Sequence, residues 1–272
     1  SFVYNFYIIV LIVSCIFCQN SKYPEGLDDF VKAEIFILEN DYKNAEKYYR
    51  KAINNTSNFP SETILIELIE LYKYKGNISK ALKLIDSISI ESLKIDILHY
   101  GILLDLDNHQ SDYMLDNILS TPSIGEDVYK LIDSQYSKHK WDHLIKVYTY
   151  LYELDNDVEY LDFIIELGII TERLNAVLEL VYSLIINSSQ IPLDYLLKFS
   201  SISIENGLHD IGVNSLEYIL SIEKNNKAAL RLLSEYYISK SMHKEALYKL
   251  NILYKYEEKS LDILRMIVEC SL

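Results

Sequence analysis

Apolar residues recur along most of this chain at intervals of three, four and seven positions, with polar residues between them. The pattern is clearest in residues 40–52, where a short polar turn leads into a stretch with Ala45, Tyr49 and Ala52 in step. Offsets of four and seven place side chains on one face of an α-helix. The two small Ala residues would let a neighbouring helix approach closely, and Tyr49 would fill the space between them. The spacing therefore predicts a packed helix.

The same frame returns further along the chain, each time after another run of helical period. A second pair of predicted helices flanks Gly76, and Ala81 follows Ala45 by 36 residues. We place the equivalent frame of the fifth pair on Ala176, Leu180 and Ser183. The third pair is irregular, and in the sixth pair the alternating Ser-Ile stretch at 201–204 favours a strand locally. Seven antiparallel helix pairs are predicted, with later frames beginning at Leu144, Gly212 and Ala246.

A helix with this Ala, aromatic, Ala spacing resembles the second helix of a tetratricopeptide repeat, whose period is about 34 residues. The resemblance covers residues 27–257 and is strongest in the first, second and seventh pairs. The chain lacks the family's Trp near the start of each first helix, and it has Ala33 or Ile69 at the family's Gly position. The resemblance implies an all-α fold, a right-handed superhelical solenoid of about seven antiparallel helix pairs that stack on their neighbours.

The first 18 residues carry no charge and are almost continuously apolar. Residues 12–15, Ile-Val-Ser-Cys, resemble the lipobox of bacterial lipoproteins, in which cleavage before the Cys leaves that Cys lipid-modified. The resemblance implies a membrane-targeting signal over 1–18, lipidation of Cys15, and a lipid-anchored or periplasmic protein of the cell envelope. A buried core helix and a short transmembrane anchor are the alternatives. Cys18 is a competing candidate for the lipid.

Two boundaries follow from composition. Residues 19–26, which contain Pro24 and Gly26, predict a short linker before a helical repeat domain over 27–272. The last stretch, 261–272, is rich in Leu, Ile, Met and Val, whereas a terminal capping helix needs a polar outer face. We therefore expect the protein to continue beyond this stretch.

The net charge of −14, from 26 Lys and Arg against 40 Asp and Glu, bears on the partner. Affinity for phosphates comes mainly from basic side chains, so the charge argues against nucleic acid. The negative charge therefore disfavours one alternative function of the helical pairs, RNA binding by a pentatricopeptide-like repeat. A protein or peptide partner is expected, and the charge would suit a basic one.

Candidate chemistry is sparse. The chain contains no phosphate-binding loop, dinucleotide fingerprint or nucleophile elbow. His139 and His143 have the spacing of zinc ligands but lack the intervening Glu of H-E-x-x-H. Cys15 and Cys18 have no second pair of ligands. We predict no catalytic residue, metal or cofactor and no enzymatic activity; the alternative is an accessory repeat region of an enzyme whose catalytic domain lies outside this sequence.

The family pattern also implies where a partner would bind. In tetratricopeptide repeats the first helix of each pair lines a concave groove. The equivalent groove-facing positions can be located in the helix pairs of this chain. None of them matches the Lys- and Asn-rich clamp with which some family members hold a C-terminal carboxylate. Four carboxylates and a tyrosine would suit a basic or aromatic-containing segment, although simple solvation of a polar face explains them equally. The predicted groove residues are Glu34, Glu70, Lys73, Asp133, Tyr136 and Glu235.

Overall fold

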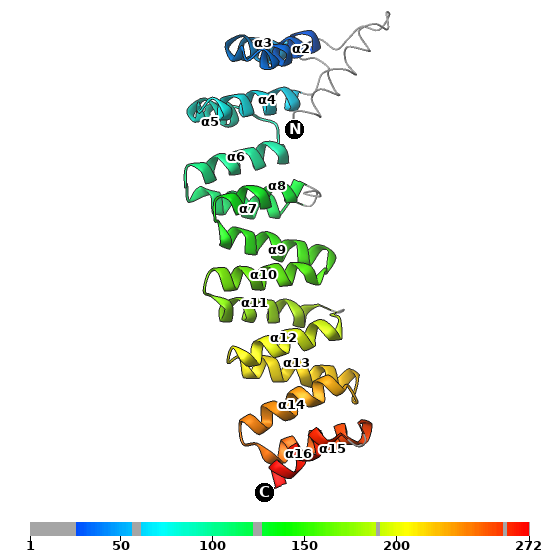
Figure 1. Ribbon diagram of the computed structural model, residues 1–272. Helices are drawn as coiled ribbons and strands as arrows, with labels where there is room; N and C mark the ends of the chain where they lie inside the picture. Colours follow the sequence, from blue (N-terminus) through cyan, green and yellow to red (C-terminus); the bar gives the residue numbers. More distant parts are fainter. Residues whose placement is uncertain (1–25, 56–60, 122–126, 189–190, 258–259, 272) are drawn as a thin grey trace, which may run out of the picture. The chain divides into compact units, whose positions relative to one another are not determined.

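The computed structural model describes residues 26–55, 61–121, 127–188, 191–257 and 260–271 (Figure 1). Throughout these ranges the regular structure is α-helical and no strand occurs, so the all-α prediction is confirmed. The alternating stretch at 201–204 lies within a helix. The helices are α2 (Leu27–Leu38), α3 (Tyr42–Asn54), α4 (Ser61–Tyr74), α5 (Ile78–Asp86), α6 (Leu93–Asp105), α7 (Gln110–Leu119), α8 (Val128–Ser137), α9 (Trp141–Asp155), α10 (Val158–Ile170), α11 (Leu174–Asn187), α12 (Leu193–Glu205), α13 (His209–Ile222), α14 (Lys227–Ser239), α15 (His243–Tyr256) and α16 (Leu261–Ser271).

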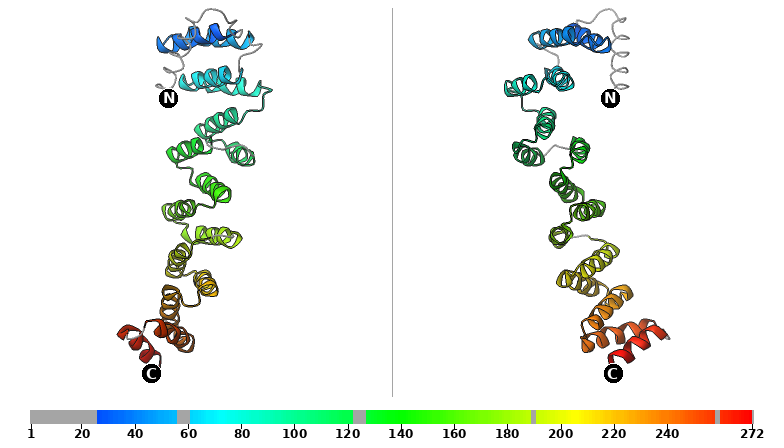
Figure 2. Two further views of the ribbon diagram at one scale, coloured as in Figure 1. Left: turned by 90° about the vertical axis from the view of Figure 1, so that its right-hand side faces the viewer. Right: turned by 60° about the vertical axis from the view of Figure 1, so that its left-hand side comes forward.

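The described helices belong to two compact units, and the boundary falls after Lys138. In the first unit α2 packs on α3, α4 on α5, and α6 on α7, while α6 also contacts α4 and α8. In the second unit α9, α10 and α11 pack in succession, followed by the pairs α12–α13 and α14–α15 and by α16 on α15. These green-to-red helices follow one another as antiparallel neighbours (Figure 2). The predicted order of helix pairs is confirmed; the fourth pair is divided, with α8 in the first unit and α9 in the second.

A short turn with one left-handed residue closes each pair. In six of the turns within the described ranges, the residue after the left-handed one donates its backbone N–H to the carbonyl oxygen five positions earlier, as from Asn77 to Tyr72 (2.8 Å) and from Arg173 to Gly168 (2.9 Å). This is the Schellman motif, which satisfies carbonyl groups at the end of a helix. Asn77 and Arg173 are also the N-caps of α5 and α11, so one helix ends and the next begins within three residues. The left-handed residues are Asn40, Gly76, Asp107, His139, Glu172, Gly207 and Ser241.

The frame of positions zero, four and seven is fully buried in α3, α7, α13 and α15. In α5 only Ala81 of the frame is buried, in α9 Tyr148 is half-buried, and in α11 the predicted frame needs a correction. In α11 Ala176 and Ser183 are exposed, and the frame begins one residue later, at Val177. The reason is a close approach of α10: a Cβ on Gly168 would lie 2.8 Å from the Val177 Cβ, so the missing side chain makes room for Val177. In five helices all three positions of the frame are buried once α11 is counted from Val177. These residues are Ala45, Tyr49 and Ala52; Ser111, Leu115 and Ile118; Val177, Val181 and Leu184; Gly212, Leu216 and Ile219; and Ala246, Leu250 and Leu253.

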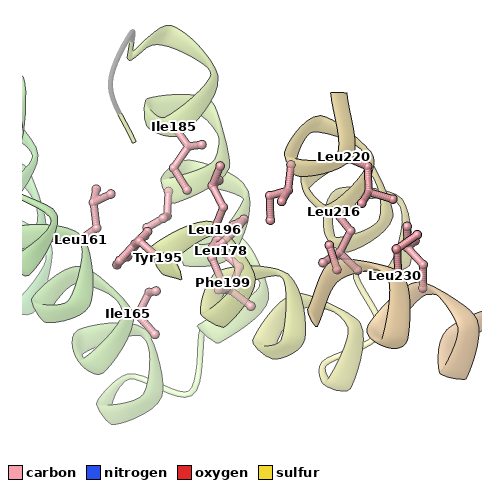
Figure 3. Close-up of a cluster of buried hydrophobic side chains, with 14 of the residues drawn as sticks. Leu161, Ile165, Leu178, Ile185, Tyr195, Leu196, Phe199, Leu216, Leu220 and Leu230 are labelled. Atoms are coloured by element: carbon pink, nitrogen blue, oxygen red, sulfur yellow. The ribbon is translucent and has the colours of Figure 1, made fainter. Parts of the chain in front are cut away.

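Small residues permit close helix packing, as the sequence predicts. A Cβ on Gly212 of α13 would lie 2.5 Å from Ile204 Cγ1 and 2.9 Å from the carbonyl oxygen of Ser200, both on α12. In the second unit the apolar faces of successive helices merge into one core, in which Leu178 of α11 lies beside Leu196 and Phe199 of α12 (Figure 3). Stability therefore comes from the stacking of neighbours rather than from single pairs.

The predicted membrane-targeting segment, with Cys15, and nearly all of the predicted linker lie outside the described residues. Among the helices of the described ranges, none combines the length and apolar character needed to cross a membrane. The last described helix, α16, buries Ile263 and Cys270, whereas Leu261 and Val268 are exposed.

Candidate interaction site

The six predicted groove residues occupy four first helices. Glu34 lies in α2, Glu70 and Lys73 in α4, Asp133 and Tyr136 in α8, all in the first unit; Glu235 lies in α14 of the second unit. Glu70, Asp133, Tyr136 and Glu235 are exposed, Lys73 is half-buried, and Glu34 is buried. Glu34 and Glu70 each lie close enough to a third carboxylate, Glu67, for their negative charges to raise its pKa.

Glu34 lies on the packed side of α2, next to the buried Phe30 and Ala33. Its carboxylate Oε1 accepts a hydrogen bond of 2.6 Å from the Tyr49 hydroxyl of α3. Burial raises the pKa of Glu34, and the hydrogen bond from Tyr49 offsets only part of that rise. Burial and the neighbouring Glu34 raise the pKa of Tyr49 well above its usual range, so Tyr49 remains a hydrogen-bond donor.

Glu67 of α4 is the residue that the sequence analysis missed. It is half-buried, and burial together with the negative charges of Glu34 and Glu70 raises its pKa to about 7. Within the described ranges no ion pair or hydrogen bond is formed by its carboxylate, and no positive charge offsets the repulsion. Its spacing of three from Glu70 places both on adjacent positions of one helix surface, which is the signal that could have identified it. We call Glu34, Glu67 and Glu70 the carboxylate cluster.

Glu46 of α3 shows the contrasting arrangement. Its burial alone would raise its pKa, but hydrogen bonds from Tyr72 (2.8 Å) and Lys80 (3.1 Å) lower the pKa below its usual value. Arg50 contributes a further contact of 3.5 Å. Negative charge is thus neutralised between α3, α4 and α5, while no cationic side chain of the described residues forms an ion pair with the carboxylate cluster of α2 and α4.

The cluster is suited to electrostatic recognition of a cation. A cationic group placed beside Glu67 would favour its ionised form and lower its pKa, which couples binding to proton release. The half-buried position of Glu67 strengthens such an interaction, because a charge pair is screened less there than at an exposed surface.

The two histidines that have the spacing of zinc ligands do not converge on a common ligand set. His139 occupies the left-handed turn before α9, with its ring 5.2 Å from that of Trp141, and His143 is buried in α9. The described part of the chain contains no group of three or more His, Cys, Asp or Glu side chains arranged to hold a metal ion.

Comparison with protein-family models finds no match for this chain, and comparison with curated proteins finds none either. Similar solved structures include the Naa15/Naa10 structure bound to HypK-THB, with 14% identity, a TM-score of 0.45 and coverage of 90% of this chain. This chain spans 39% of the length of the matched Naa15/Naa10 chain. A tetratricopeptide repeat protein from Parabacteroides merdae is 11% identical, with a TM-score of 0.41 and coverage of 91% of this chain and 99% of that protein. Similarities this low carry no inference about activity, so function has to be argued from the geometry of the chain.

Proposed function

We propose that this protein is a non-catalytic interaction scaffold. It binds a basic segment of a partner protein along the surface formed by the first helix of each helix pair. The observation that carries the proposal is the carboxylate cluster, in which Glu67 has no partner of opposite charge among the described residues. Stacked helix pairs present such side chains along an extended surface, which suits a polypeptide ligand. The abundance of carboxylates argues against the RNA-binding alternative, because it would repel phosphates.

The proposed affinity is modest and depends on salt and pH. An exposed charge pair contributes about 0–1 kcal/mol and is weakened by salt. Because the pKa of Glu67 is about 7, its carboxyl is half protonated near neutral pH. Binding of a cationic segment should therefore strengthen as the pH rises through 7.

We further propose that the scaffold is exported and held at a bacterial cell envelope by a lipid on Cys15. The support for this is the uncharged apolar run over 1–18 and the resemblance of residues 12–15 to a lipobox. The non-catalytic role is likewise proposed from the sequence, which has no recognisable catalytic motif. An accessory role beside a separate catalytic domain is the alternative.

The binding proposal is tested with charge-neutralising variants. Glu67→Gln with Glu70→Gln removes two charges of the carboxylate cluster with little change of shape. The matched control, Glu153→Gln with Glu179→Gln, removes two exposed charges from α9 and α11. Full-length proteins would be used to capture partners from envelope extract at low and at high salt, with quantitative mass spectrometry.

The wild type and the control should retain the same partners at low salt, whereas the Glu67 and Glu70 variant should lose those with basic segments. High salt should release the same partners from the wild type. If the cluster variant retains every partner at wild-type levels, the carboxylate cluster is not the binding site.

A further inference from the structure

A pocket of about 300 Å³ opens in the second unit between α11, α12 and α13. Ile185 of α11 and Leu196 of α12 form two of its apolar walls (Figure 3), and Ile191 lies between these helices in the chain. The volume is at the lower end of the range of roughly 300–1,000 Å³ that small-ligand pockets occupy. The pocket therefore has room for one large side chain rather than for an extended ligand.

The lining of this pocket is free of charge, although the chain carries a net charge of −14. Apolar side chains also surround the mouth: Ile186 is 62% exposed and Tyr218 is 54% exposed. Transfer of a charged group into such surroundings is costly unless the group is paired. The pocket thus selects an uncharged apolar group.

The walls are held by the core and need not form upon binding. The ring of Tyr182, which lines the pocket, stacks on Phe199 with a centroid distance of 6.4 Å and an interplanar angle of 3°. Phe199 is almost completely buried. A preformed site avoids much of the ordering cost that weakens binding.

Asn214 supplies a side-chain amide to the lining. Its side chain is exposed and makes no hydrogen bond within the described ranges. The two serine hydroxyls of the lining are already engaged as donors, since Ser215 donates to the Ile211 carbonyl (2.9 Å) and Ser188 donates to the Asn156 side chain (3.3 Å). A side-chain amide offers both a donor and an acceptor, which match the N–H and C=O of a peptide backbone.

We propose that this pocket binds one aromatic or branched aliphatic side chain of an extended segment of a partner protein, with Asn214 paired to the backbone of that segment. A polypeptide is favoured over a free apolar molecule because the exposed side-chain amide of Asn214 belongs to the lining and makes no hydrogen bond within the described ranges, so it can pair with the backbone of a bound residue. The inference takes its class of ligand from the proposed scaffold role, but it uses other helices and another chemistry than the carboxylate cluster.

The test follows the isoleucine methyl NMR signals of the full chain during titration with capped amino acids. N-acetyl-tryptophan amide and N-acetyl-leucine amide should shift the signals of Ile185, Ile186 and Ile191 saturably. N-acetyl-lysine amide and N-acetyl-aspartate amide should not. If all four probes act alike, or none does, the pocket is not an apolar binding site.

Two variants separate the role of the apolar side chains at the mouth from that of the Asn214 amide. Ile186→Lys places a charge at the mouth and should weaken binding of N-acetyl-tryptophan amide about tenfold or more. Its matched control is Ile170→Lys, a substitution of a 53% exposed residue of α10 outside the pocket, which should bind as the wild type does. Equal binding by both variants would overturn the assignment of the pocket.

Asn214→Ala should weaken binding of N-acetyl-tryptophan amide about two- to tenfold, as expected for one neutral hydrogen bond. It should not affect 3-methylindole, which has the same ring system without peptide groups. If 3-methylindole binds the wild type as tightly as the capped amino acid does, and Asn214→Ala changes neither, the pocket takes a free apolar molecule and the peptide proposal is wrong. The double variant Glu67→Gln with Glu70→Gln should bind these probes as the wild type does. The proposals for the carboxylate cluster and for the pocket can therefore be confirmed or refuted independently.

Discussion

At the scale of single residues, Glu46 and Glu67 show how neighbours decide the behaviour of a buried carboxylate. Both lie in the first unit, yet the pKa of Glu46 is lowered and that of Glu67 is raised to about 7. Burial acts in the same direction on both. The difference comes from Tyr72 and Lys80 beside Glu46, against Glu34 and Glu70 beside Glu67.

We expect Glu67→Gln to change the pH dependence of stability. The pKa of Glu67 is about 7 in the folded protein against an ordinary value of 4.5. The folded state therefore holds this proton more tightly, and the stability that the proton confers is complete below pH 4.5 and lost as the pH rises through 7. Since each pKa unit corresponds to about 1.4 kcal/mol, the loss is on the order of 1–3 kcal/mol.

The measurement is the free energy of unfolding in urea for the wild type and Glu67→Gln at several pH values. The free energy of unfolding of the variant should increase relative to that of the wild type as the pH rises from 4.5 to 7, because glutamine never ionises. Taking the difference between the two proteins removes the contributions of the carboxylates that do not interact with Glu67. Glu153→Gln, at an exposed site, serves as the control and should follow the wild type. A difference that does not vary with pH would show that Glu67 titrates normally.

At the scale of helices, three glycines inside helices have different surroundings. Gly168 and Gly212 stand where a neighbouring helix approaches closely, whereas a Cβ on Gly101 of α6 would meet only the Lys73 Nζ, at 3.6 Å. The close approach at Gly212 includes the backbone oxygen of Ser200, which cannot move independently of its helix. Packing rather than backbone freedom thus explains Gly212.

Substitution of Gly101 and of Gly212 by alanine should have opposite effects on stability. Gly101→Ala should stabilise the protein by about 1 kcal/mol, because glycine weakens a helix interior relative to alanine. Gly212→Ala should destabilise it by about 1–3 kcal/mol, because the added methyl group overpacks the contact with α12. Urea unfolding of the two variants beside the wild type measures both effects. Stabilisation by both substitutions would mean that α13 can shift away from α12 without cost.

At the scale of the whole molecule, the proposed attachment to a membrane depends on a short stretch near the start of the sequence. The uncharged run over 1–18 and the Ile-Val-Ser-Cys stretch at 12–15 lie outside the described residues, so the prediction stays one from sequence. All 40 acidic residues of the 272-residue chain follow this uncharged run.

Expressed in a bacterium with a complete start, the protein should partition into detergent and carry a lipid on Cys15. Cys15→Ser should abolish both, while Cys18→Ser should leave them unchanged. Mass spectrometry of the processed N-terminus and detergent phase separation are the measurements. Loss of the lipid in Cys18→Ser alone would assign it to Cys18, and no effect of either substitution would refute the lipoprotein proposal.

The sequence by itself determined the helices, most of the turns between them and several of the small residues at close contacts; Ala176 was wrongly placed on a buried face. Helical period is a local property, since side chains three, four and seven positions apart share a face whatever surrounds them. Ala45, Gly212 and Ala246 could therefore be assigned to buried faces in advance. Some turns were harder to predict. Glu172 and Ser241 adopt the same left-handed conformation as Gly76 and Gly207, but only a glycine indicates that conformation in the sequence.

Only the tertiary structure decided which of two apolar stripes is buried and which polar residues meet. Helix α11 has apolar residues on adjacent stripes, and the gap at Gly168 selects the one that begins at Val177. Glu34 and Glu67 are 33 positions apart, and their interaction exists because α2 and α4 belong to neighbouring helix pairs. The pocket beside Asn214 likewise needs three helices to form its walls. Spacing along a chain specifies which residues share a helix face, but contacts between helices depend on how those faces pack.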